Sequence, residues 1–444
     1  MELLRLTRSV CPTCLKEVEA RIVDRGDAVV MEKGCDDHGP VEVLLARDGT
    51  ALRELLPLRE RLGLGRGGGE SYSLYVTSRC NEPCPTCFAN QCLDGYHEPS
   101  VFEVRSALEG LHAPRVSVFG GEPTERADLF EIVSAIRDAG GEPVVFTNGL
   151  KLVDPNYARE LVDAGAREVR LEIDTLDPDI LARLRGADVL DAKLTALDNL
   201  DTLGATAFIE AVVVPGVNES PFDMLMELAA RTPCVRGISF RSYAFRPRPK
   251  ERRVQPLRPD ELIALATEAT DGAVTIARVV AFQKVLAAFL RLAGHRWCPA
   301  DLIYPMVRHG EDVVPVHDVA DVDALASAVE RTAHLWSTYP ALATVRLSAA
   351  AAPHLAGREA MGLGASAIQR VLAALVGRQT SLDSDLVLLS FGAFCDPTVI
   401  DLDLMGQCPV RDLLHPERRA MCASYLAYLR DAPTDRRIWK VRAP

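Results

Sequence analysis

Alternation of strand-like and helix-like segments between residues 71 and 244 constrains the fold of this chain more than any other feature. Six apolar runs typical of strands are separated by amphipathic helical runs. The expected strands are Ser73–Thr77, Arg115–Phe119, Pro143–Thr147, Glu168–Asp174, Ala207–Val214 and Gly237–Tyr243. The expected helices include Val101–Leu111, Ala127–Asp138, Tyr157–Ala164, Leu190–Leu203 and Phe222–Arg231. This order predicts an α/β fold with a parallel sheet and right-handed crossovers. Because a closed barrel of this kind needs eight units, we expect an open, partial (β/α)6 barrel.

Three cysteines follow the first expected strand. Cys80, Cys84 and Cys87 lie in the run CNEPCPTC, so one tight loop offers three thiolates with no fourth at a matching distance. Three ligands suit a four-iron cluster with one iron left open, and catalytic metal sites keep such an open position. Active-site loops of parallel α/β sheets follow the strands. The spacing therefore predicts a catalytic iron–sulfur centre.

A second group of metal-ligand residues lies near the N-terminus. Cys11 and Cys14 form a C-x2-C pair, and Cys35 and His38 form a C-x2-H pair. Paired knuckles of this kind predict a mononuclear metal site. Zinc is the general expectation for three thiolates and one imidazole, and iron in a rubredoxin-like site is the alternative.

Polar residues also end two of the later strands. Asn148 follows the third expected strand, and Glu172 and Asp174 lie on one face at the end of the fourth. Carboxylates at strand ends are suited to bind ribose hydroxyls, as they do in dinucleotide sites. The alternative is that these carboxylates are simply solvated.

Composition limits the possible partners and location. The formal net charge of −12 argues against a nucleic-acid partner. We find no apolar stretch long enough for a transmembrane segment and no signal peptide, so we expect a cytoplasmic protein. There, twelve cysteines indicate metal sites and not disulfides.

A chain of 444 residues is long enough for two or three domains. We expect a metal-knuckle module at residues 1–50, a helix and Gly-rich linker at 51–70, the partial barrel at 71–254 and a C-terminal domain at 255–444. That last part looks mainly helical. Its apolar stretch Ala277–Leu290 predicts either a buried core helix or the wall of a lipid-sized pocket.

The cysteine triplet, followed by Gly120-Gly121-Glu122-Pro123 after the second strand, resembles the motifs of radical S-adenosylmethionine (radical SAM) enzymes. The resemblance implies a partial barrel, a [4Fe-4S] cluster and bound SAM. It also implies that Gly120, Gly121, Glu122 and Pro123 hold the SAM amino group, and that the loop containing Asn218 lies beside the adenine. Arg185 and Arg241 are candidates for binding the SAM carboxylate, since a guanidinium matches that group.

Other motifs narrow the resemblance to one subgroup. CPTC…CxxHG, Cys87-Phe-Ala-Asn90 and Gly95-Tyr-His-Glu-Pro-Ser100 are similar to motifs of the tetraether lipid synthases and the dihydropterin methyltransferase-like proteins. Members of that subgroup carry auxiliary clusters in their C-terminal part. We therefore expect one auxiliary [4Fe-4S] cluster on Cys298, Cys395, Cys408 and Cys422. The alternative is that these cysteines are small buried apolar residues.

The resemblance implies reductive cleavage of SAM to a 5′-deoxyadenosyl radical, which abstracts hydrogen from an unactivated carbon. We expect methylation or C–C bond formation on a small molecule or lipid, with flavodoxin or ferredoxin as the electron donor. The alternatives are a radical SAM enzyme that modifies a peptide, and a non-catalytic iron–sulfur sensor or electron carrier. The sequence names no residue that returns hydrogen to the substrate.

Overall fold

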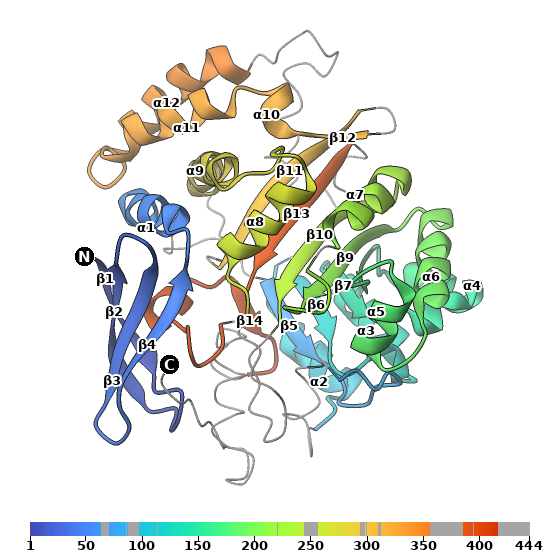
Figure 1. Cartoon of the computed structure of the whole chain (residues 1–444). Coiled ribbons are helices and arrows are strands. Elements are labelled where there is room, and N and C mark those ends of the chain that lie inside the picture. Colours follow the sequence, from blue (N-terminus) through green and yellow to red (C-terminus); the bar gives the residue numbers. More distant parts are fainter. Residues whose placement is uncertain are drawn as a thin grey trace.

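The N-terminal residues form a separate four-stranded antiparallel sheet in the order β1-β2-β3-β4. The structure is a computed structural model, and it describes residues 1–63, 71–85, 87, 97–112, 114–219, 221–243, 256–293, 298, 300–309, 312–355, 385–393 and 395–415. The strands are β1 (Glu2–Val10), β2 (Glu17–Asp24), β3 (Val29–Cys35) and β4 (Gly39–Ala46), and helix α1 (Thr50–Leu62) follows them. We call residues 1–50 the N-terminal module, and Figure 1 shows it on one side of the molecule.

Ten strands form the main sheet, in the order β12-β11-β13-β10-β9-β8-β7-β6-β5-β14. All strand pairs from β13 to β14 in this order are parallel, which confirms the expected parallel sheet. The six expected strands are β5 (Ser71–Tyr75), β6 (Arg115–Phe119), β7 (Glu142–Thr147), β8 (Glu168–Glu172), β9 (Thr206–Val213) and β10 (Val235–Ser242).

Helices between these strands cover the outer side of the sheet (Figure 1). They are α2 (Val101–Leu108), α3 (Leu129–Asp138), α4 (Pro155–Ala164), α5 (Pro178–Arg185), α6 (Leu190–Thr202) and α7 (Phe222–Arg231), with short 3-10 turns at Pro123–Glu125 and Leu150–Val153. Local sequence fixes several helix starts. For example, Asp177 caps α5 by accepting a hydrogen bond from the Ile180 backbone N–H, and Pro178 occupies the first helical position. The sequence analysis did not predict α5.

Segments from the C-terminal half extend both edges of the main sheet. Strands β13 (Leu386–Gly392) and β11 (Asp301–His309) follow β10, and β12 (Asp312–Pro315) pairs with β11. At the opposite edge, β14 (Val410–Asp412) pairs in parallel with β5. The sequence analysis missed these strands, because β13 is apolar at nearly every position and so shows no strand periodicity. The sheet therefore crosses the expected boundary at residue 255.

Six C-terminal helices complete the described fold: α8 (Pro259–Ala269), α9 (Ile276–Ala293), α10 (Val316–Val319), α11 (Val322–Ala333), α12 (Pro340–Leu355) and α14 (Leu402–Met405). Helix α9 contains the apolar stretch noted above and packs against α1, α11 and β11, as a core helix does. Two polar residues of α9 also contact other parts of the protein. Gln283 donates to the Ile303 carbonyl, and Lys284 pairs with Glu54 and Glu330.

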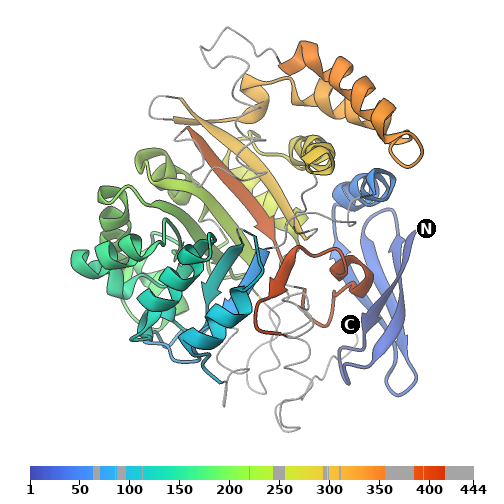
Figure 2. The same ribbon diagram turned by 180° about the vertical axis from the view of Figure 1, so that it is seen from behind.

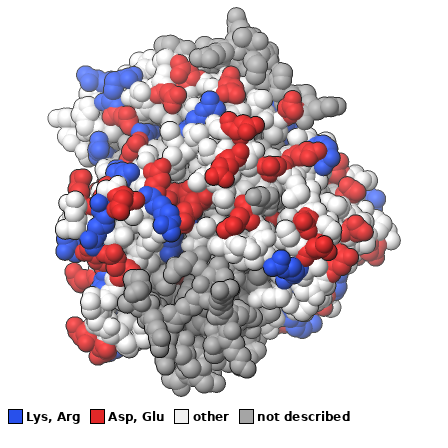
Figure 3. All heavy atoms as spheres, in the orientation of Figure 1, with Lys and Arg blue, Asp and Glu red and all other residues white. Residues whose placement is uncertain are grey.

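The surface carries mixed charge. Figure 3 shows acidic and basic side chains interspersed on the face of Figure 1. None of the helices that the structure describes is both long enough and apolar enough to cross a membrane.

Candidate active site

The cysteine triplet lies where the sequence places it, directly after β5 at the C-terminal edge of the parallel strands. Cys80 is exposed, Cys84 is buried and Cys87 is half-buried. Within the loop, the Glu82 backbone N–H lies 3.4 Å from Cys80 Sγ, and the Cys87 N–H donates to the Cys84 carbonyl at 3.2 Å. Three thiols on one short loop fit the ligand set of a four-iron cluster.

Partial removal of the sulfur from water opposes ionisation of two of these thiols, Cys80 and Cys84. It raises the pKa of Cys80 to about 11, and it raises the pKa of Cys84 well above its usual range. Metal ligation requires thiolates, so loading a cluster here must release protons from this loop.

The glycine pair after β6 clamps the start of the cysteine loop. A Cβ atom on Gly120 would lie 2.3 Å from the Thr77 carbonyl oxygen, and one on Gly121 would lie 2.3 Å from the Arg79 carbonyl oxygen. The Gly121 and Glu122 backbone N–H groups donate to these same two oxygens, both at 2.7 Å. The glycines are therefore required for the close approach of the loop's own backbone.

Glu122 is buried and accepts four hydrogen bonds from the protein. Oε1 accepts from the Thr124 N–H, the Thr124 hydroxyl and the Thr147 hydroxyl, at 3.0, 2.7 and 2.7 Å. Oε2 accepts from the Asn148 N–H at 2.8 Å. Glu122 thus joins the ends of β6 and β7, and Oε2 keeps a lone pair for a further donor. Pro123, also buried, begins the short 3-10 turn after it.

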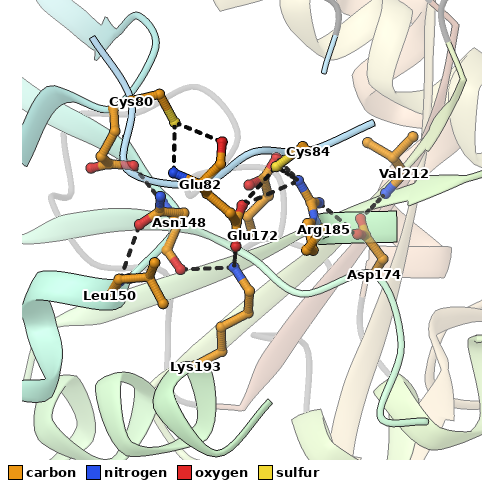
Figure 4. A network of polar contacts seen from close by, with 12 residues as sticks. Cys80, Glu82, Cys84, Asn148, Leu150, Glu172, Asp174, Arg185, Lys193 and Val212 are labelled. Carbon is orange, nitrogen blue, oxygen red and sulfur yellow. Dashed lines mark hydrogen bonds and ion pairs between the residues drawn. The ribbon is translucent and has the colours of Figure 1, made fainter. Parts of the chain in front are cut away.

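Buried charges surround Cys84 (Figure 4). The Cys84 thiol donates to Glu82 Oε2 at 2.9 Å, and Arg185 Nη1 lies 3.7 Å from Cys84 Sγ. Lys193 Nζ lies 3.2 Å from Glu82 Oε1, an ion pair without hydrogen-bond geometry, and donates to the Asn148 carbonyl at 2.9 Å. Helix α5 therefore places Arg185 beside the cysteine loop, and helix α6 places Lys193 there. We call Glu82, Arg185 and Lys193 the loop anchor.

Arg185 also contacts the two carboxylates at the end of β8, Glu172 and Asp174. Arg185 Nη1 lies 2.7 Å from Glu172 Oε1, and Arg185 Nη2 lies 2.6 Å from Asp174 Oδ2. Asp174 Oδ1 accepts from the Val212 N–H at 2.8 Å, so this buried carboxylate is held by protein groups on both oxygens. Glu172 differs, because its side chain is 33% exposed.

Two amide side chains hold neighbouring loops. Asn148 Nδ2 donates to Asn81 Oδ1 at 2.8 Å, which ties the loop after β7 to the cysteine loop. Asn218 Oδ1 accepts from the Val214 N–H at 2.7 Å, and its Nδ2 donates to the Val212 carbonyl at 2.8 Å. Asn218 is buried, so the side chain shapes its own turn.

The four residues of the N-terminal module do come together. Their four ligand atoms, one each from Cys11, Cys14, Cys35 and His38, lie within 4.8 Å of one another. The sulfurs of Cys14 and Cys35 are 3.8 Å apart, and His38 Nδ1 lies 3.5 Å from Cys35 Sγ and 3.7 Å from Cys11 Sγ. Metal–sulfur bonds of about 2.3 Å in a tetrahedron require sulfurs about 3.8 Å apart. The residues therefore fit a tetrahedral metal ion.

The C-terminal cysteines are only partly assembled in the described residues. A hydrogen bond from the Cys298 thiol lowers the pKa of Cys408 to about 7, so these two cysteines are neighbours. Cys395 follows β13 and is half-buried. Cys422 lies outside the described residues. The expected four-cysteine auxiliary site stays a prediction.

Sequence reasoning missed two members of the loop anchor, Glu82 and Lys193. Glu82 stands between two ligands in the sequence, and this position could have marked it. Lys193 lies in an ordinary helical pattern, and only its complete burial identifies it. Both arginines considered for the SAM carboxylate are engaged by protein carboxylates, since Arg241 pairs with Asp301 as Arg185 pairs with Asp174.

Comparison with known proteins identifies two domains. Residues 3–47 match the HMPTM N-terminal zinc ribbon domain, and residues 74–229 match the radical SAM superfamily. A 7,8-dihydro-6-hydroxymethylpterin dimethyltransferase from Methanocaldococcus jannaschii is 28% identical over 370 residues, which cover 73% of this chain and 72% of that protein.

Further relatives match over shorter stretches. A GTP 3′,8-cyclase from Nautilia profundicola is 29% identical over 178 residues, 38% of this chain, and the chain spans about half of that protein (54%). The crystal structure of Streptococcus suis SuiB bound to S-adenosylmethionine has a TM-score of 0.39 and 18% identity, covering 50% of this chain and 51% of that one. The domain matches, together with the cysteine loop and the four-residue knuckle, lead to one conclusion: the chain carries a radical SAM domain preceded by an N-terminal zinc ribbon domain.

Proposed function

We propose that this enzyme cleaves SAM reductively and uses the 5′-deoxyadenosyl radical to abstract hydrogen from an unactivated carbon of a small molecule. The observation that carries the proposal is the Cys80–Cys87 loop, which lies at the C-terminal edge of the sheet and is clamped by Gly120 and Gly121. When bound by these cysteines, a [4Fe-4S] cluster supplies the electron. The reaction balances as SAM, one electron and substrate R–H giving methionine, 5′-deoxyadenosine and R•.

The contacts of each strand-end residue support different roles in SAM binding. Glu122 keeps a lone pair on Oε2 and suits the SAM ammonium. Glu172 is the more exposed of the two carboxylates at the end of β8 and suits a ribose hydroxyl. Asp174 and Asn218 have their polar atoms engaged by the protein, so we assign them to shaping the SAM-binding loops.

We further propose that the product is a methylated or C–C-coupled small molecule, with a reduced pterin as the first substrate to test. Support comes from the dimethyltransferase relative, whose name specifies a dihydropterin. A lipid substrate is the alternative class. The electron donor would be a flavodoxin or ferredoxin, in a cytoplasmic setting that keeps thiols reduced.

The test is anaerobic reconstitution with iron and sulfide, followed by dithionite, SAM and 6-hydroxymethyl-7,8-dihydropterin. 5′-Deoxyadenosine should form in the wild type and not in Cys84→Ala. With a second SAM as the methyl donor and a second electron from dithionite, the pterin should gain mass in methyl increments, and each methylation should also release S-adenosylhomocysteine. About four irons per chain would indicate the barrel cluster alone, and about eight would support one auxiliary cluster.

Two negative outcomes differ in meaning. If 5′-deoxyadenosine forms but the pterin is unchanged, the radical chemistry stands and the substrate proposal is wrong. If a fully loaded cluster gives no 5′-deoxyadenosine with or without the pterin, the enzyme assignment loses its support and a sensor or electron carrier is favoured.

A further inference from the structure

The segment between β13 and β14 lies against the N-terminal module. We call residues 395–409, which carry Cys395 and Cys408, the linking segment. Figures 1 and 2 both show the linking segment beside β1, although the two are separated by almost 400 residues of sequence. Contacts between α14 and β1 confirm that they touch.

Alternate residues of β1 make these contacts. The Thr7 hydroxyl donates to Asp401 Oδ1 at 2.5 Å, and the Ser9 hydroxyl donates to the Ile400 carbonyl at 2.7 Å. Thr7, Ser9 and Asp401 are all buried. Arg5 Nη1 adds an ion pair with Asp401 at 3.4 Å. Residues 5, 7 and 9 share one face of the strand, and Arg8, from the other face, also contacts the linking segment by donating to Asp403 Oδ1 at 2.9 and 2.8 Å.

A buried lysine on β3 completes the interface. Lys33 is only 5% exposed, and its Nζ donates to Ser9 Oγ, the Pro397 carbonyl and the Thr398 carbonyl, at 3.1, 3.0 and 2.8 Å. All three N–H donors of the ammonium therefore hydrogen-bond to Ser9 or to the turn that follows Cys395. Ala20 of β2 is in register with both Lys33 and Thr7, and its small side chain leaves room for the lysine to reach β1.

The same strands also carry the metal knuckle. β1 ends at Val10, next to Cys11, and β3 ends at Cys35. An ion held by these cysteines would therefore fix the ends of the two strands that grip the linking segment. At the other end of that segment, Cys408 meets Cys298, and β14 joins β5.

We propose that the zinc ribbon is a structural clamp that holds the linking segment in place through Lys33, Ser9 and Thr7. The clamp positions Cys395 and Cys408 relative to the barrel, so Lys33 and Ser9 are positioning residues for whatever those cysteines bind. This role is independent of the substrate and of SAM cleavage.

The experiment is hydrogen exchange by mass spectrometry on the full-length protein with its ribbon metal bound. Lys33→Met removes the three donors while keeping an apolar stem, and Lys16→Met is the control, because Lys16 is an exposed lysine of the same module whose contact is the surface residue Asp37. Exchange within 395–409 should become about tenfold faster or more in Lys33→Met, as expected for the loss of hydrogen bonds to a charged group. Peptides from β6 and β7 should not change, nor should any peptide in Lys16→Met.

A second variant separates clamping from folding of the ribbon. Ser9→Ala removes the hydroxyl that reaches Ile400 and adds no strain, and the zinc content of each variant is measured alongside. Faster exchange of 395–409 in Ser9→Ala with zinc retained supports the clamp. Unchanged exchange of 395–409 in Lys33→Met overturns the proposal. Loss of zinc in Lys33→Met together with full protection of 395–409 in Ser9→Ala also overturns it.

Discussion

Replacing Lys193 with methionine tests whether the loop anchor stabilises the cysteine loop. Lys193 is completely buried, and its ammonium lies between Glu82 Oε1 and the Asn148 carbonyl, at 3.2 and 2.9 Å. Methionine has a similar length and is apolar, so the change leaves little cavity. It does leave the buried Glu82 carboxylate without its nearest cation.

The expected cost follows from that unpaired charge. Removing one partner of a buried ion pair costs about 3–5 kcal/mol. Arg185 remains 3.8 Å from Glu82 Oε2, so we expect the lower end, about 3 kcal/mol. That corresponds to exchange about 100-fold faster for backbone amides that open with the loop.

The assay is native-state hydrogen exchange of the peptide covering 71–85 in the iron-free protein, compared with a peptide from β9. Glu82→Gln combined with Lys193→Met removes both charges, and we expect it to recover much of the loss, since paired removal of buried charges is far less costly. Exchange within threefold of wild type in Lys193→Met would refute the reasoning. The reasoning would also be refuted if the changes in opening free energy caused by the two substitutions simply added, because the two charges would then not interact.

Three further predictions follow from single contacts. Gly121→Ala places a Cβ 2.3 Å from the Arg79 carbonyl oxygen and should lower the iron bound after reconstitution. Iron equal to wild type would contradict the need for glycine beside the cysteine loop. Cys14→Ser should remove the ribbon metal while leaving iron in the barrel, as measured by elemental analysis; joint loss of both metals would show that the sites are not independent. Burial raises the pKa of Asp260, which accepts the Arg47 N–H, so its contribution to stability should be lost as pH rises from about 4. Asp260→Asn should flatten that part of the pH dependence of the urea midpoint, and an unchanged slope would refute the assignment.

Much of the barrel could be predicted because local pattern and tertiary structure agree there. Strand β6 and helix α7 begin and end at the residues that the periodicity indicates. The ribbon ligands could also be predicted, since the C-x2-C and C-x2-H spacings are typical of metal knuckles, and the antiparallel sheet brings Cys11, Cys14, Cys35 and His38 together.

The remaining features depend on contacts between distant residues. β13 is a uniformly buried strand, and β14 has three residues, so neither has a periodicity that sequence can reveal. Gly120 and Gly121 were expected to hold the SAM amino group, and that role stays a prediction; what the structure shows is that they admit the backbone of Thr77 and Arg79. The role of Lys193 depends on Glu82, more than 100 residues away, and helical spacing carries no information about such a pair.

The order in which the sheet is assembled has a consequence for synthesis of the protein. β5 and β10 border the six-strand core, yet both receive their outer neighbours, β14 and β13, from near the end of the chain. During translation, the core would leave the ribosome with two unpaired parallel edges and the metal-binding loop already attached to one of them. Exposed strand edges invite pairing with other chains. Chains that stop before residue 386 should therefore aggregate even though every predicted metal ligand of the barrel and the ribbon has been made.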